Sequence, residues 1–337
     1  MLLNLLCDPT TKGPLHLKDP QYRNGSIESG WLVSESGDKY PIINGIPRFV
    51  VEAPSDSVTS FGDEWNHFNF VAFKDNWLRH TVKNTFGSAD VFRDRFIVDA
   101  GAGSGSQSLW MLESGARHVV ALELSHSVDD VILRNIDREK WGNFDIVQCS
   151  IDAPPIRDQS ICGIVICHNV IQHTPSVEKT AHALFALVGN EGEFVFNCYP
   201  RNDKGFLRWI RWHLIYLPLR YILSRMPFSV ILGYARVTAL LRLIPGLGEL
   251  MEKLHICVQG DVPLRPESQL SRLKRRFKAT TLNTFDAYGS HAFQHHKPDE
   301  EIIDLLNDLQ PDSRKILNRS KYFLRPMPIG CALRVRR

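Results

Sequence analysis

The chain has 337 residues, of which 43% are hydrophobic and 23% are charged. This composition is typical of a globular protein with more than one domain, or with one large domain that carries insertions. It excludes disordered, collagen-like and low-complexity classes. The formal net charge is +3, so the chain is not a general polycation, and we expect no DNA partner.

The seven cysteines are scattered and form no C-x-x-C pair. An odd number with this spacing predicts neither a disulfide framework nor a zinc ribbon. The first residues, MLLNLLCDPTTKG, lack the basic start and the long apolar run of a signal peptide. We therefore expect a reducing, cytoplasmic location.

The first 94 residues precede the predicted core. Residues 1–50 are expected to form a small β-rich module, because short apolar runs alternate with turn residues. Residues 51–94 are predicted to be a linker followed by N-terminal lid helices. The linker, 51–60, is polar and contains a proline, and aromatic residues then recur at irregular spacing.

Residues 95–200 alternate short apolar strands with segments of helical length. This alternation predicts a parallel sheet with helices on both faces. Strands are expected at 96–100, 118–123, 144–149, 163–168 and 193–199, and helices at 104–115, 126–138 and 176–188. A C-terminal part of the same domain, 286–337, should add an amphipathic helix at 299–309 and a last strand at 329–335.

Residues 201–285 interrupt this alternation and are predicted to form a helical, basic insertion or lid. The segment 201–278 holds 15 lysines and arginines but only five acidic residues. The stretch 206–247 is long enough to cross a bilayer, but six arginines interrupt it, and no part free of arginine reaches the roughly 20 residues that a span requires. We therefore expect no transmembrane helix. Two interpretations of this segment remain open. It could be a helical cap whose arginines are solvated or paired, or it could have a face that rests on a membrane.

The most specific motif is FIVDAGAGSGSQS at 96–108, in which a buried strand leads directly into Gly101, Gly103 and Gly105. Glycine allows a sharp turn and a close approach of a ligand to the backbone, and the amides of the following helix would face that ligand. Glu123 ends the next strand, 22 positions after Gly101, where a carboxylate can accept hydrogen bonds from a ribose diol.

Two ligand classes use such a loop. A dinucleotide site requires G-x-G-x-x-G, but the third position is Ser106 or Ser108 here, which disfavours a nicotinamide oxidoreductase. The pattern D-x-G-x-G-x-G, which begins at Asp99, resembles the first motif of class I S-adenosylmethionine-dependent methyltransferases. The resemblance implies a Rossmann-like, seven-stranded α/β sheet with helices on both faces, and S-adenosyl-L-methionine as cofactor.

The resemblance continues through residues 145–200, which are similar to the second half of a methyltransferase core. It implies that Asp152 reads the adenine amino group, and that the segment from His168 to His173 lies beside the methionine part and the methyl group. The cofactor-binding residues that it implies are Asp99, Gly101, Ala102, Gly103, Gly105, Gln107, Glu123, Leu124, Ile151, Asp152 and His168.

Residues 1–50 resemble the zinc-ribbon module of the tRNA-methyltransferase activator family, through LLCDPTTKGPL and YPIINGIP. Zinc-binding members carry four cysteines, whereas only Cys7 is present here, so we expect no zinc. Fused members of the family also carry segments similar to FGDEWNHF at 61–68 and FDAYGSHAFQHHKPDEEIIDLL at 285–306.

A quinone-pathway subgroup of O-methyltransferases has an E-x-x-E-H metal site after its fourth strand. The same places hold Asn169, Gln172 and His173 here. Because amides replace both carboxylates, we expect no divalent metal there.

A base is needed only if the acceptor is a hydroxyl or a protonated amine, and histidine suits that role. The candidate catalytic residues are His168, His173 and His291, although the first two could instead shape the cofactor pocket or cap a helix. An exposed loop, or a metal site completed by Asp286, are alternatives for the residues around 291. The residues proposed to bind the acceptor are Trp65, Tyr288, His291, Gln294 and His295.

These observations predict S-adenosylmethionine-dependent methyl transfer, by O- or N-methylation, to a small-molecule acceptor or to a glycan or lipid-linked intermediate. The resemblance alone implies bacterial secondary or envelope metabolism. The alternatives are a non-catalytic scaffold with the same fold and an RNA methyltransferase, the latter because Lys274, Arg275 and Arg276 are clustered. Neither the acceptor nor the oligomeric state follows from the sequence.

Overall fold

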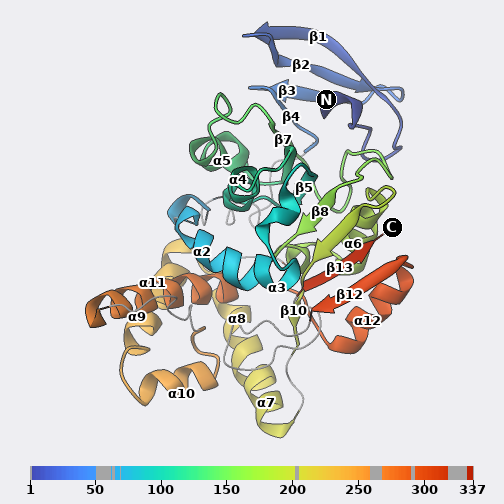
Figure 1. Ribbon diagram of the computed structural model, residues 1–337. Helices are drawn as coiled ribbons and strands as arrows, with labels where there is room; N and C mark the ends of the chain where they lie inside the picture. The colour runs from blue at the N-terminus through green and yellow to red at the C-terminus, as the bar shows by residue number, and fades with distance from the viewer. Residues whose placement is uncertain are drawn as a thin grey trace. The chain divides into compact units, whose positions relative to one another are not determined.

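The computed structural model describes residues 2–50, 62, 65–68, 70–201, 205–258, 268–289, 293–317 and 332–336. The chain folds into two compact units. The first contains Met1–Pro200, Phe293–Ser320 and Met327–Arg337, and the second contains Arg201–Ala292 and Lys321–Pro326. In Figure 1 the first unit carries the labelled strands, and the labelled elements of the second unit are helices.

The core of the first unit is a sheet with the strand order β12-β13-β9-β8-β5-β6-β7 (Figure 1). The five strands from β9 to β7 are parallel, which confirms the predicted α/β fold, and β13 runs antiparallel to both of its neighbours. Residues 329–331 of the predicted last strand lie outside the described residues. The bounds are β5 Phe96–Ala100, β6 His118–Glu123, β7 Phe144–Gln148, β8 Ile164–Cys167, β9 Glu193–Phe196, β12 Ser313–Leu317 and β13 Ala332–Arg336.

Both faces of the parallel strands are covered by helices (Figure 1). Alternate residues of a strand point to opposite faces, so Val98 and Val120 belong to one hydrophobic cluster and Ile97 and Val119 to another. Burial on both faces explains why most residues of these strands are apolar. The first cluster includes α6 (Val177–Ala186) and α12 (Asp299–Asp308), and the second includes α4 (Ser106–Glu113) and α5 (Val131–Asn135).

The helix predicted at 126–138 is divided in the structure. A 3-10 turn, η5, spans His126–Asp129, and α5 begins only at Val131. Asp130 lies between them with non-helical backbone angles, and its carboxylate accepts a hydrogen bond from the Val131 N–H. The prediction of one continuous helix is therefore wrong, because a local side-chain cap competes with helix continuation.

Residues 15–47 form a second, antiparallel sheet in the order β1-β2-β3-β4. This sheet belongs to the same compact unit as the main sheet, and Leu6 forms a bridge pair with Ile156. The buried Arg48 guanidinium donates hydrogen bonds to the Asp129 carboxylate at 3.0 Å and to Gln148 Oε1, at the end of β7, at 2.8 Å. The bounds are η1 Leu2–Asn4, β1 Leu15–Arg23, β2 Ser26–Ser34, β3 Lys39–Ile43 and β4 Ile46–Pro47.

Asp8 organises the turn before β1. Its buried Oδ1 accepts hydrogen bonds from the backbone N–H groups of Thr10 at 2.9 Å and Thr11 at 2.7 Å. The Tyr40 hydroxyl donates to Oδ2 at 2.8 Å. Burial works against the charged form, but the hydrogen bonds from Thr11 and Tyr40 outweigh it, and the pKa of Asp8 is lowered from its usual value.

A series of short helical turns precedes β5. Trp77 stacks on Phe92, with 5.6 Å between ring centroids, and lies 5.3 Å from Trp110 of α4. These turns therefore pack on the same face of the sheet as α4 and α5. Their bounds are η2 Val71–Phe73, α2 Lys74–Asn76, the π-helical η3 Trp77–Val82, α3 Lys83–Thr85 and η4 Ala89–Phe92.

The second unit is helical and packs around an aromatic cluster that contains Trp212, Tyr216 and Tyr288. No helix in the part of the chain that the structure describes is long and apolar enough to cross a membrane. The bounds are α7 Phe206–Ile210, the π-helical η7 Arg211–Tyr216, α8 Leu217–Leu223, α9 Phe228–Leu241, α10 Leu247–Lys253 and α11 Gln269–Tyr288. Helix α11 thus runs past residue 285, where the predicted insertion ended.

Asp8→Ala should lower the free energy of unfolding of the first unit by about 1–3 kcal/mol, because it leaves buried donors unpaired. Since the pKa of Asp8 is lowered in the folded state, its contribution is present at neutral pH and is lost as the pH falls through that folded-state pKa. Urea unfolding at several pH values measures both effects. The half-exposed Asp158, whose ion pair with Lys12 spans 3.7 Å, provides the control variant Asp158→Ala. Equal losses for the two variants would contradict this role of Asp8.

Candidate cofactor and acceptor site

The glycine loop joins β5 to α4 at the carboxyl edge of the sheet. Gly101, Gly103 and Gly105 have φ values of 83°, 57° and 74°, in the left-handed region that side chains rarely adopt. A Cβ added to Gly101 would collide with the Val170 side chain, and one added to Gly103 would lie 2.9 Å from the Trp65 ring. The loop therefore needs glycine both for its conformation and for these close contacts.

Glu123 fastens the glycine loop to the end of β6. Its Oε2 accepts a hydrogen bond from the Gly103 N–H at 2.7 Å, and its Oε1 accepts one from the Ser125 N–H at 2.8 Å. The Ser127 hydroxyl donates to the Gly103 carbonyl at 2.8 Å. Each carboxylate oxygen has a second lone pair, so Glu123 can still accept hydrogen bonds from a ligand diol.

Asp99 lies in β5, just before the loop, and is buried. The Ser108 hydroxyl donates to its Oδ2 at 2.6 Å. Burial raises the pKa of Asp99 to about 6, and the nearby charge of Glu123 adds to the rise. Two buried carboxylates close together create a negative potential that favours a cationic ligand.

Unpaired polar atoms follow β8, beside the glycine loop. His168 Nδ1 and both amide atoms of Gln172 are buried and have no hydrogen-bond partner among the residues that the structure describes. His168 Nε2 lies 3.4 Å from the Thr81 hydroxyl of η3. Burial lowers the pKa of His168 to about 4, so its ring is neutral near pH 7. Because buried polar groups are normally paired, these atoms mark a place where a ligand could bind.

The segment around β11 (His296–Lys297) lies beside this edge. It pairs in parallel with β10 (Tyr199–Pro200), and the His295 N–H donates to the Gln172 carbonyl at 2.8 Å. His295 Nε2 lies 3.0 Å from the Thr174 carbonyl. Gln294 Oε1 is buried and has no partner in the described part of the chain. The predicted acceptor residues Gln294 and His295 therefore lie next to the segment that follows β8.

His173 Nδ1 lies 3.1 Å from the Phe293 carbonyl oxygen. A carbonyl can only accept, so we assign the ring proton to Nδ1, which leaves the lone pair on Nε2. The ring also packs edge-on against Tyr199, with 5.6 Å between centroids. A neutral imidazole in this tautomer can act as a general base through Nε2.

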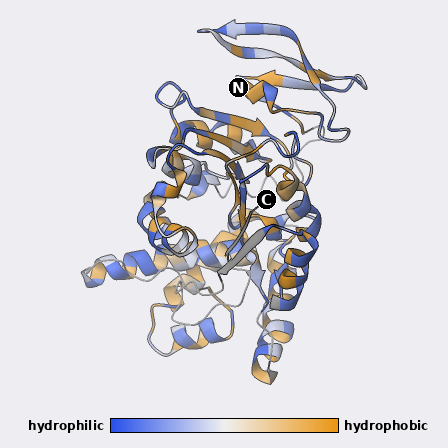
Figure 2. Ribbon diagram, turned by 45° about the vertical axis from the view of Figure 1, so that its right-hand side comes forward, coloured by the Kyte–Doolittle hydropathy of each residue, from blue (hydrophilic) through white to orange (hydrophobic). Residues whose placement is uncertain are grey.

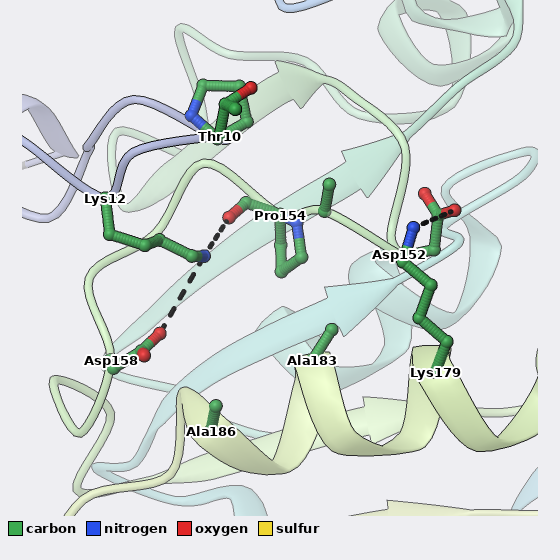
Figure 3. A pocket seen from close by; sticks show the side chains of 10 residues that line it. Thr10, Lys12, Asp152, Pro154, Asp158, Lys179, Ala183 and Ala186 are labelled. Atoms are coloured by element: carbon green, nitrogen blue, oxygen red, sulfur yellow. Dashed lines mark hydrogen bonds and ion pairs between the residues drawn. The ribbon is translucent and has the colours of Figure 1, made fainter.

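Asp152 borders a pocket of about 400 Å³ between the first residues of the chain, the loop after β7 and α6 (Figure 3). Its carboxylate accepts hydrogen bonds from the Ser150 hydroxyl and from Lys179 at 3.4 Å. Lys12 lines the other end of the pocket, where it donates a hydrogen bond to the Pro154 carbonyl and forms an ion pair with Asp158 (Figure 3). Contact of Asp152 with adenine stays a prediction.

The other predicted site residues occupy varied positions. Gln107 Oε1 accepts from the Trp77 indole at 2.9 Å, and the Leu124 carbonyl accepts from Gln148 at 3.2 Å. Ala102 and Ile151 are buried in the hydrophobic clusters. Tyr288 is buried in the second unit, where its hydroxyl donates to the His255 carbonyl. His291 lies outside the described residues.

Sequence reasoning missed several residues of the site. Ser125 and Ser127 lie in the loop that follows Glu123 and β6, so a search for polar residues after each strand would have found them. Gln172, which the sequence comparison considered only in place of a metal ligand, is also found by this search, since it follows β8. Ser108 and Thr81 carry no such signal, because their contacts with Asp99 and His168 arise only from the packing of α4 and η3.

Residues 98–196 match the model of a methyltransferase domain family. The ubiquinone biosynthesis O-methyltransferase of Erwinia tasmaniensis is 26% identical over 152 residues, which cover 45% of this chain and 56% of that protein. Protein arginine N-methyltransferase 1 of Oryza sativa is 29% identical over 87 residues, which cover 24% of this chain and 21% of that protein. The chain thus spans about half the length of the first relative and about a fifth of the second.

Solved structures of similar proteins include an O-methyltransferase family protein from Burkholderia thailandensis. It is 12% identical to this chain, with a TM-score of 0.40, and the match covers 79% of this chain and 58% of that one. An S-adenosylmethionine-dependent methyltransferase from Mesorhizobium loti is 15% identical, with a TM-score of 0.39, over 73% of this chain and 92% of that one.

The family match at residues 98–196 supports a class I methyltransferase domain in this part of the chain. Its cofactor is S-adenosyl-L-methionine. The loop fits this group, because Gly101 and Gly103 leave no room for a Cβ and Glu123 offers lone pairs to a ribose diol. The buried carboxylates suit the positive charge of its sulfonium and ammonium groups.

Glu123→Gln should weaken the affinity for S-adenosylhomocysteine about ten- to hundredfold, because a hydrogen bond to a charged group is worth about 1.5–3 kcal/mol. Calorimetric titration measures the dissociation constant. Glu113→Gln, at the far end of α4 where Glu113 pairs with Lys74 at 2.6 Å, is the control and should bind as the wild type does. Unchanged affinity in the Glu123 variant would contradict this assignment.

Proposed function

We propose that this chain transfers the methyl group of S-adenosylmethionine to an oxygen or nitrogen atom of a small-molecule, glycan or lipid-linked acceptor. One observation carries the proposal: the buried, unpaired atoms of His168 and Gln172 follow β8 at the edge where Val170 contacts the glycine loop. Polar atoms left unpaired beside a cofactor loop are suited to bind the second reactant.

When bound, S-adenosylmethionine supplies an electrophilic methyl group for an in-line displacement. The residues of the chain position the reactants and exclude water from them. Glu123 orients the ribose end, Asp99 balances positive charge, and the Trp65 ring against Gly103 excludes water. Holding two reactants in attack geometry is the largest contribution that such a site can make.

The two histidines after β8 are suited to different roles. His168, with its pKa lowered to about 4, is a weak base and serves better as a neutral hydrogen-bonding partner. His173 carries its proton on Nδ1, held by the Phe293 carbonyl, and its Nε2 lone pair can take the proton that leaves the acceptor hydroxyl or amine. We therefore assign His173 as the general base.

The curated relatives support both O- and N-methylation, because one is an O-methyltransferase and the other an arginine N-methyltransferase. The test is to incubate the protein with S-adenosylmethionine that carries a radiolabelled methyl group, together with separate pools of small molecules, lipids, RNA and protein. Label in the small-molecule or lipid pool supports the proposal. Label only in RNA or protein, or cofactor binding without transfer to any pool, would contradict it and favour an RNA enzyme or a scaffold.

His173→Gln should lower the rate of methyl transfer to the labelled pool about 10²–10⁴-fold if the acceptor must lose a proton. The dissociation constant of S-adenosylhomocysteine should not change. His182→Gln is the matched control, because His182 pairs with Asp308 on the helices α6 and α12, at 2.8 Å. If the rate of the His173 variant rises with pH until it equals the wild-type rate, the variant lacks a base. Equal rates in the two variants would rule out His173 as the base.

A further inference from the structure

The helices of the second unit expose many large apolar side chains. Phe206 and Leu207, at the start of α7, are 77% and 78% exposed. In Figure 2 the helices of this unit carry strongly hydrophobic residues among strongly hydrophilic ones. We use the name exposed apolar face for a set of exposed residues from α7 to α9 and the turn that follows α9: Phe206, Leu207, Trp209, Leu214, Tyr221, Ile222, Val230, Val237, Leu240, Leu241 and Ile244.

Helix α9 shows that this exposure is systematic. Its buried side carries Ile231, Ala235 and Ala239, which follow one another at intervals of four residues. The opposite side carries Val230 and Val237, seven residues apart, and both are exposed. A surface helix of a globular protein normally places polar residues on its outer side. Helix α9 is apolar on both sides, so its outer side is built to contact an apolar partner.

Positive charge is concentrated in the same segment of the chain as the exposed apolar face. The segment 201–278 holds 15 lysines and arginines but five acidic residues, although the net charge of the whole chain is only +3. In the first half of α11, Arg272, Lys274, Arg276 and Lys278 are all exposed. Arg225 lies over the Tyr221 ring, 3.7 Å from its centroid, within the exposed apolar face itself.

We propose that the exposed apolar face docks onto the surface of an anionic lipid bilayer. Exposed aromatic residues and leucines, with arginines and lysines around them, are the composition of helices that lie in the membrane interface. Anionic headgroups complement the positive charge, whereas a second copy of this strongly basic segment would repel the first. Because no described helix can span a membrane, the contact is peripheral. The inference rests on the second unit alone and does not depend on the proposed transfer reaction.

The test is co-sedimentation of the full chain with phosphatidylcholine vesicles, prepared with and without phosphatidylglycerol. We expect binding to the vesicles that contain phosphatidylglycerol, with weaker binding as salt is raised. Equal binding to both vesicles, or no binding to either, would overturn the proposal. Self-association in sedimentation velocity runs without vesicle binding would also overturn it, in favour of a second copy as the partner.

Two double variants locate the contact: Phe206→Asp with Leu207→Asp, and Val237→Asp with Leu240→Asp. Each should weaken vesicle binding by about tenfold or more, because charged groups replace apolar ones at the interface. The control is Tyr22→Asp with Ile43→Asp, exposed apolar residues of the first unit, and it should bind as the wild type does. Circular dichroism confirms that each variant is folded. If both variants of the second unit bind vesicles as the control does, the exposed apolar face is not the contact.

Discussion

The site depends on the two hydrogen bonds that the Glu123 carboxylate accepts from the backbone of Gly103 and Ser125. The glycine loop has three left-handed residues in a row of five. Glycine adopts these angles without steric cost but loses much conformational entropy when it is fixed, so the loop needs contacts that hold it in one conformation. Glu123 supplies this hold from the neighbouring strand, and the contacts of Val170 and Trp65 with the glycines close the loop from other sides. The residue expected to bind the ribose is thus also the residue that shapes the loop.

The two units carry charge of opposite sign, buried in the first unit and exposed in the second. In the first unit, negative charge is buried: Asp99 has a pKa raised to about 6 and lies near Glu123, which suits a cationic cofactor. In the second unit, positive charge is exposed among apolar side chains of α7 to α11. A chain with a net charge of only +3 therefore carries two strong and separate electrostatic features, which the total charge conceals.

Prediction from the sequence succeeded where a pattern is local. The strands β5 to β9 are mostly apolar because both of their faces are buried. The spacing of Gly101, Gly103 and Gly105 follows from backbone angles that other residues avoid. It failed at 126–138, where the cap at Asp130 divides one predicted helix. It also missed Thr81 and Ser108. The partner of Thr81, His168, lies far along the chain, and Ser108 reaches Asp99 only because α4 packs against β5.

The sequence by itself determined the α/β class, the glycine loop and the acid at the end of the second strand, because each depends on residue type and short-range spacing. Only the tertiary structure decided which polar atoms stay unpaired after β8, which tautomer His173 adopts, and which apolar side chains of α9 remain exposed. These properties depend on what packs against each group. The residue type fixes which hydrogen bonds, protonation states and apolar contacts a side chain can form. The groups that pack around it decide which of these it forms.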